Sequence, residues 1–212
     1  MFSKIREPVS GLTHLVGGIA AIVALIALLV IGRSDTAKEL SLLIYSLSLI
    51  ILFSASAMYH LILANSNIIK ILRKLDHSAI YVLIAGTYTP FWILAFRGFS
   101  HWGMLAIVWS FALAGIIVKI FYVNAPRWVN AIIYVVMGWL GISAVGQVTS
   151  ALPVNVLVWL ITGGVIYTLG AIVYSTKIFN FIPGKFGFHE VWHLFVLLGA
   201  TAHFISVLLL VV

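Results

Sequence analysis

Five polar side chains with metal-site chemistry lie near the ends of long apolar segments: Ser56, His60, Asp76, His189 and His193. His189 and His193 are four residues apart, so on a helix their imidazoles share one face about one turn apart. Imidazole nitrogens bind zinc at about 2.0–2.1 Å, and three such ligands leave a fourth position open for water, as in catalytic zinc sites. Three histidines and an aspartate at one depth therefore predict a metal site, with zinc as the first candidate.

The elements that position these residues are predicted to be membrane-spanning helices. The 212-residue chain is 63% hydrophobic and 8% charged, with a mean hydropathy of +1.20, far above the usage of soluble domains. Its apolar runs approach or exceed the roughly 20 residues that cross a bilayer as a helix. We expect an all-α integral membrane fold, a single seven-helix domain over residues 1–212. The predicted spans are 13–32, 40–63, 76–96, 102–122, 128–149, 154–176 and 190–212.

The charged residues predict how this bundle is oriented. With a cytoplasmic N-terminus and an extracytoplasmic C-terminus, nine basic residues fall in inner loops and three in outer loops, as the positive-inside rule requires. The nine are Lys4, Arg6, Lys70, Arg73, Lys74, Lys119, Arg127, Lys177 and Lys185; the three are Arg33, Lys38 and Arg97. All five site candidates then lie at the cytoplasmic face, because the second span ends there and the third and seventh spans begin there.

Individual members of the group have defined expected roles. Asp76 is expected to begin a helix, where the dipole favours a carboxylate, and either to accept a hydrogen bond from the water or to bind the metal directly. Ser56 is expected to donate to the water or to an oxyanion. Taken singly, Asp76 is equally a helix cap and Ser56 a small packing residue. A carboxylate or histidine inside a membrane is costly and usually functional, so the combination favours a site.

Other titratable residues lie near the same face. Glu7 and His14 either complete the inner mouth of the site as a second shell or simply sit at the interface. His77 neighbours Asp76 but points elsewhere on a helix. His203 lies ten residues beyond His193, roughly 15 Å of helical rise, so it cannot share the same ion. The sequence assigns no role to His77 or His203.

Residues 189–193 also match the H-E-x-x-H pattern of zinc proteases, in which Glu190 would be the general base. Three fixed positions are weak evidence, and no third histidine follows at the spacing of the extended signature. The alternative is that Glu190 is an ordinary carboxylate in the first turn of a helix. We consider the protease interpretation the weaker of the two.

Composition also bears on partners. The formal net charge is +7, but the basic residues are scattered among loop ends and form no stripe with interleaved aromatics, so no nucleic-acid partner is expected. Without cysteine, neither a disulfide framework nor a thiolate metal site is available. Oligomeric state is not indicated.

Several segments together resemble a known family, the bacterial hemolysin III proteins of the progestin and adiponectin receptor family. The matching segments follow the family's order over essentially the whole chain. They are residues 7–14, Ser56-x-x-x-His60, Leu75–Ser78, Ala85–Pro90, Pro183–Phe186, His189-x-x-x-His193 and His203-Phe204.

The resemblance implies seven helices, a cytoplasmic N-terminus and zinc held near the inner leaflet by His60, His189 and His193. It places Asp76 and Ser56 at the positions associated with a zinc-bound water. We therefore expect a zinc-dependent hydrolase of a lipid amide or ester in the bacterial inner membrane, similar to alkaline ceramidases and affecting lipid homeostasis. A membrane lipid would be its substrate or ligand. The alternatives are a receptor-like or membrane-sensing protein with structural zinc, and a hemolysin-type pore.

Overall fold

The computed structural model describes residues 5–33, 35–182 and 186–212, apart from the side chains of residues 99–101. Over these residues the chain is helical and contains no named strand; two residues, Ile182 and Phe186, form an isolated bridge. The elements are α1 (Pro8–Gly32), α2 (Thr36–Leu61), α3 (Ser66–Ala95), α4 (Gly98–Phe121), α5 (Arg127–Gly138), the 3-10 helix η1 (Leu140–Ala144), α6 (Val145–Ala151), α7 (Val154–Thr176) and α8 (Phe188–Val211).

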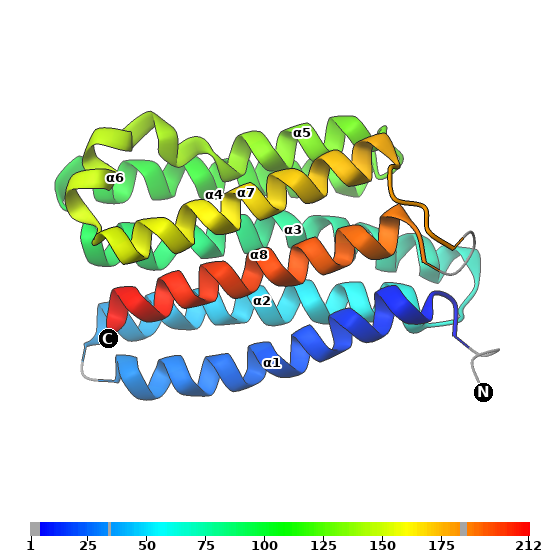
Figure 1. Cartoon of the computed structure of the whole chain (residues 1–212), viewed down its shortest axis with the longest axis horizontal. Helices are drawn as coiled ribbons and strands as arrows, with labels where there is room; N and C mark the ends of the chain where they lie inside the picture. Colours follow the sequence, from blue (N-terminus) through cyan, green and yellow to red (C-terminus); the bar gives the residue numbers. More distant parts are fainter. Residues whose placement is uncertain (1–4, 34, 183–185) are drawn as a thin grey trace.

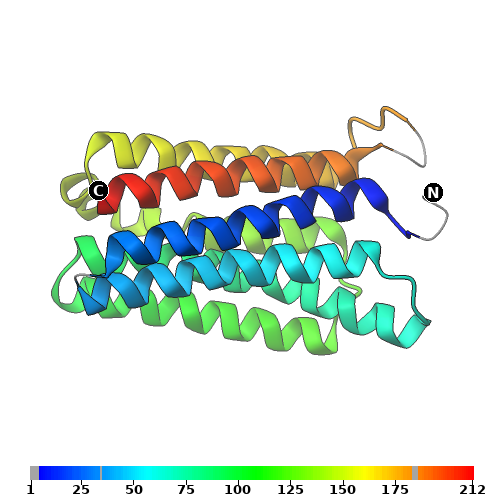
Figure 2. The ribbon, with the colours of Figure 1, turned by 90° about the horizontal axis from the view of Figure 1, so that it is seen from below.

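Seven of the described segments are long and apolar enough to cross a membrane. Six are single helices, and the seventh, Arg127–Ala151, combines α5, η1 and α6. The prediction of an all-helical fold with seven spans is confirmed. An odd number of spans places the start of α1 and the end of α8 at opposite ends of the bundle (Figures 1 and 2).

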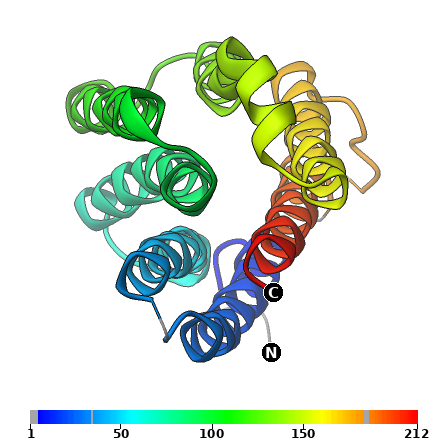
Figure 3. The same cartoon turned by 90° about the vertical axis from the view of Figure 1, so that its left-hand side faces the viewer.

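The helices are arranged in a ring when the bundle is viewed end-on (Figure 3). α1 packs against α2 and α8, α3 packs against α2, α4 and α5, and α7 packs against α5 and α8. α2 ends, and α3 and α8 begin, at the end of the bundle where α1 begins (Figure 1). The bundle therefore brings the start of α1, the end of α2 and the start of α8 together, although they are far apart in the sequence.

The third helix differs from the prediction in its length. α3 begins at Ser66, where the Asn65 side chain accepts a hydrogen bond from the Ile68 amide at 3.0 Å. Asp76 therefore lies in the helix interior, and the expectation that it begins a helix is wrong. Hydropathy missed the first ten residues because they carry three basic side chains, whereas a helix can extend past the apolar layer into the headgroups.

The fifth span also differs, because it is not one continuous helix. α5 ends at Gly138, and η1 links it to α6. The Tyr88 hydroxyl of α3 donates to the Gly138 carbonyl at 2.8 Å and accepts from the Gly141 amide at 2.9 Å. A break in a membrane helix is tolerated where a neighbouring side chain satisfies the freed backbone groups, and Tyr88 does so here.

Candidate metal site and adjoining cavity

The structure brings three histidines from two helices together at the end of the bundle where α1 begins. His60 lies in the last turn of α2, while His189 and His193 lie in the first turns of α8. Each offers one ligand nitrogen, and these atoms all lie within 4.8 Å of one another. The ring centroids are 4.7, 4.8 and 5.1 Å apart, so the imidazoles form a nearly equilateral triangle. This group, which we call the triad, can hold a metal ion.

The two ligand nitrogens on α8 have a separation that fits a metal ion. The Nε2 atoms of His189 and His193 are 3.2 Å apart. Two ligands at 2.0–2.1 Å on a tetrahedral ion would be about 3.3 Å apart. The Nε2 atom of His60 is buried and has no hydrogen-bond partner among the described residues. An unpartnered buried nitrogen is costly, and a metal ion would complete its bonding.

Glu7 sets the orientation of His60. Its Oε2 lies 2.5 Å from His60 Nδ1, so Nδ1 donates its proton and Nε2 is left with a lone pair. Metal-binding histidines commonly donate their second N–H to a carboxylate in this way. Glu7 lies just before α1, where Pro8 occupies the first turn, a position that suits proline. The sequence left open whether Glu7 closes the inner mouth of the site or simply sits at the interface; the structure places its carboxylate against His60.

His14 lies beside the triad. Its ring faces that of His193, with centroids 3.9 Å apart, and its Nε2 lies 3.4 Å from the His193 carbonyl oxygen. His14 is 3% exposed, and its side chain is buried where α1 packs against α8. It therefore packs against a metal-ligand candidate and is not part of the triad.

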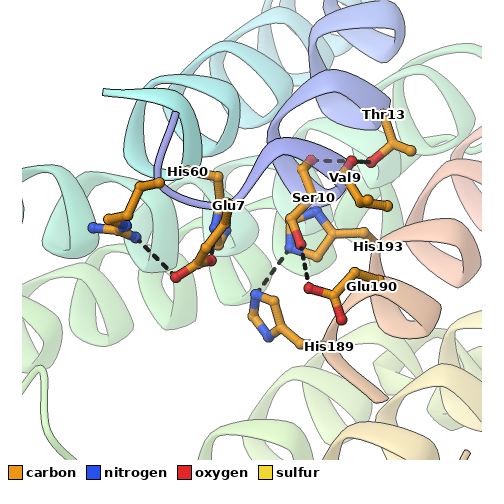
Figure 4. Close-up of polar contacts among 9 residues, drawn as sticks. Glu7, Val9, Ser10, Thr13, His60, His189, Glu190 and His193 are labelled. Carbon is orange, nitrogen blue, oxygen red and sulfur yellow. Dashed lines mark hydrogen bonds and ion pairs between the residues drawn. The ribbon is translucent and has the colours of Figure 1, made fainter. Parts of the chain in front are cut away.

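Glu190 is not a member of the triad, and its carboxylate is joined to Ser10 (Figure 4). Its Oε2 accepts from the Gly187 amide at 2.8 Å, which caps the start of its own helix, and its Oε1 accepts from the Ser10 hydroxyl at 3.3 Å. Both carboxylate oxygens are thus occupied by hydrogen bonds that stabilise α8 and join it to α1. This arrangement favours the structural interpretation of Glu190 over the protease one. The contact from Ser10 was missed, because no sequence pattern links residues 180 positions apart.

Asp76 and Ser56 lie next to the triad. The Asp76 carboxylate interacts with the Ser56 hydroxyl and, electrostatically, with His60. Ser56 lies one turn before His60 on α2 and is 2% exposed. Asp76 and Ser56 thus bring a carboxylate and a hydroxyl to the cavity wall near His60.

A cavity of about 410 Å³ adjoins this group. Such a volume is within the usual range for ligand pockets. Its lining includes Asp76, Ser56, His14, His189 and His193 at one end, and Val145 and Thr149 of α6 near the opposite end of the bundle (Figure 1). Most of the wall is aliphatic or aromatic. The cavity therefore connects the polar group to an apolar space inside the bundle.

The two histidines to which the sequence assigned no role also line this cavity. His77 follows Asp76, and its backbone carbonyl accepts from the Tyr134 hydroxyl at 3.2 Å. His203 lies deeper, and its Nε2 is 3.1 Å from the carbonyl oxygen of Leu160. As expected, His203 is separate from the triad. Lys4, Pro183, Gly184 and Lys185, used above for orientation or resemblance, lie outside the described residues.

Fold and site together define a multi-pass, seven-helix membrane protein with a histidine group that can hold a metal ion at one end of the bundle. Residues 2–204 match the family described as haemolysin-III related, and the chain belongs to this family. It is 38% identical to Hemolysin-3 of Bacillus cereus over 205 residues, covering 96% of this chain and 90% of that protein. It is also 38% identical to the Hemolysin-3 homolog of Bacillus subtilis (strain 168) over 210 residues, which cover 98% of this chain and 95% of that protein. A more distant relative is the monocyte to macrophage differentiation factor of Homo sapiens. It is 29% identical over 177 residues, which cover 82% of this chain and 71% of that protein.

Proposed function

We propose that this protein is a zinc-dependent hydrolase of a lipid amide or ester, acting at the cytoplasmic leaflet of the bacterial inner membrane and contributing to lipid homeostasis. One observation carries the proposal: the cavity that holds Asp76, Ser56 and two of the triad histidines at one end continues as an apolar space through the bundle. A polar reaction centre joined to an apolar channel suits a substrate with a polar head and a long hydrocarbon chain.

Each residue has a chemical task in this proposal. His60, His189 and His193 would hold the zinc, which would polarise the substrate carbonyl and make water more acidic. Asp76 would accept the proton of the attacking water and deliver it to the leaving amine or alkoxide, as a general base and then a general acid. Ser56 would orient this carboxylate or donate a hydrogen bond to the developing oxyanion. Glu7 would keep His60 in the tautomer whose Nε2 binds metal.

The charge distribution supports a cytoplasmic location for the triad. Seven described basic residues lie at the triad end of the bundle and three at the other end. Basic residues are enriched on the cytoplasmic side of membrane proteins. The first group is Arg6, Lys70, Arg73, Lys74, Lys119, Arg127 and Lys177; the second is Arg33, Lys38 and Arg97.

The test begins with the metal content of detergent-purified wild-type protein beside His193→Ala and Asp76→Asn. We expect about one zinc per chain, lost in His193→Ala and kept in Asp76→Asn, because only the first change removes a ligand. The same proteins are then incubated with lipid amides and esters, and released fatty acid is measured by mass spectrometry. Wild type should release fatty acid, whereas both variants should not. Zinc-loaded wild type that hydrolyses none of these lipids would contradict the proposal.

A second candidate function is supported by the placement of the triad between two helices. α2 and α8 each pack against α1 and α3, and a metal held by His60, His189 and His193 would join them directly. Zinc would then stabilise a receptor-like or membrane-sensing bundle. In that case zinc removal would lower the unfolding temperature, while Asp76→Asn would leave both stability and biological function unchanged.

A pore is less well supported. The names of the Bacillus relatives refer to haemolysis, but the cavity of this chain is lined mainly by apolar side chains. Conducting pores are lined by polar groups or carbonyl oxygens. Ion conductance of the purified protein in liposomes would be needed to favour this alternative.

A further inference from the structure

A second polar position lies deep in the cavity, far from the triad. The Nε2 atom of His203 is 3.1 Å from the Leu160 carbonyl oxygen. A carbonyl oxygen only accepts hydrogen bonds, so Nε2 carries the proton and Nδ1 is left with a lone pair. None of the described residues donates a hydrogen bond to this Nδ1, and His203 lines the cavity. His203 therefore presents a hydrogen-bond acceptor to the cavity interior.

Tyr167 of α7 lies beside His203, and two glycines make room for the pair. The rings meet edge to face, with centroids 5.3 Å apart. A Cβ on Gly163 of α7 would lie 2.2 Å from the His203 ring, and a Cβ on Gly199 of α8 would lie 2.9 Å from the Tyr167 ring. Each helix thus lacks a side chain where the other helix places its polar ring. This reciprocal fit holds both rings in defined positions.

The neighbouring hydroxyl groups of the cavity wall already have partners. Thr87 and Thr168 donate to carbonyl oxygens of their own helices at 2.8 and 2.7 Å, and Tyr88 donates to Gly138. The Tyr167 hydroxyl has no such partner among the described residues, although Tyr167 also lines the cavity. Polar groups inside a membrane bundle are costly and usually functional. Tyr167 and His203 thus offer a ligand one hydroxyl and one lone pair.

We propose that Tyr167 and His203 recognise a hydroxyl group on the hydrocarbon chain of the bound lipid. A hydroxyl suits this pair because it can donate to Nδ1 of His203 and accept from Tyr167. His203 lies ten residues beyond His193 on α8, which is roughly 15 Å of rise. The recognised hydroxyl therefore lies near the middle of a long chain whose polar head is at the triad. This inference rests on the proposed function, because it requires a lipid chain in the cavity.

The experiment measures binding, so it needs no turnover. Three fatty acids of equal length serve as probes: one without a hydroxyl, one with a hydroxyl next to the carboxylate, and one with a mid-chain hydroxyl. Their affinities for full-length, detergent-purified protein are measured by calorimetry. Wild type should bind the mid-chain hydroxy acid about 3- to 10-fold more tightly than the other two, the effect of one or two net hydrogen bonds.

Two variants test the assignment. Tyr167→Phe removes a single oxygen, and His203→Phe replaces the imidazole with a ring that cannot accept a hydrogen bond. Both should bind the unsubstituted acid like wild type and lose the preference for the mid-chain hydroxyl. Should His203→Phe fail to fold, Tyr167→Phe still decides. A preference that survives the substitution, or equal binding of all three acids by wild type, overturns this inference alone. Failure of wild type to bind any of them overturns it too and also removes the support for a lipid in the cavity.

Discussion

His60 and Glu7 are joined by two hydrogen bonds that run in opposite directions. The Glu7 amide donates to the His60 carbonyl at 2.9 Å, and His60 Nδ1 donates to the Glu7 carboxylate at 2.5 Å. Burial opposes ionisation of Glu7, but the hydrogen bond from His60 and the positive charge of Arg6 favour the carboxylate, and the pKa of Glu7 lies below its usual value. Glu7 is therefore a carboxylate at neutral pH, and it fixes His60 with its Nε2 directed away from this bond.

This relationship predicts that Glu7→Ala weakens zinc binding without removing a ligand. We expect about a tenfold loss of zinc affinity, because substitutions of such partners typically cost 10- to 100-fold and the Glu7 side chain is 40% exposed. The measurement is a competition titration with a zinc chelator on purified protein.

A matched control is Glu39→Ala, since Glu39 lies in the first turn of α2 at the opposite end of the bundle. It removes the same charge but should leave zinc affinity unchanged. Equal zinc affinity in Glu7→Ala and wild type would show that His60 does not need this carboxylate to bind metal.

Glu190 is predicted to stabilise the fold and to take no part in the reaction. Glu190→Ala removes the acceptor for the Gly187 amide and for the Ser10 hydroxyl, and it should lower the free energy of unfolding by about 1 kcal/mol. Unfolding in detergent, followed by circular dichroism, measures this change.

Glu190→Gln keeps an acceptor oxygen and serves as the comparison. This variant should retain zinc and hydrolytic activity, because the Glu190 oxygens are engaged by the Gly187 amide and the Ser10 hydroxyl. A Glu190→Gln protein that holds zinc normally but has lost hydrolysis would instead support the protease-like role.

Tyr88 is predicted to be required for the broken fifth span. Tyr88→Phe leaves the Gly138 carbonyl and the Gly141 amide without their partner. Unsatisfied buried groups cost about 1–3 kcal/mol each, so we expect a loss of about 2 kcal/mol or more in the free energy of unfolding. Tyr122→Phe removes the same atom from a side chain that is 71% exposed, and it should have little effect. Similar stabilities of the two variants would show that the break does not depend on Tyr88.

The sequence alone was enough to predict the seven spans and the gathering of His60, His189 and His193. Hydropathy reports local chain composition, and in lipid an apolar run of sufficient length must be a helix. The spacing of His189 and His193 places them on one face for the same local reason, while alternation of the spans places His60 at the same end. These conclusions need no knowledge of how the helices pack.

Tertiary structure decided which partners each side chain meets. Glu7 and His60 are 53 residues apart, and Ser10 and Glu190 are 180 apart. The first contact depends on how α1 is rotated against α2, and the second on how α1 is rotated against α8. The same is true of the break held by Tyr88 and of the reciprocal fit of Tyr167 and His203 against glycines. Local patterns set the length and depth of each helix. The rotation of a helix about its axis is set by its packing against all neighbouring helices at once, so it is known only from the packed bundle.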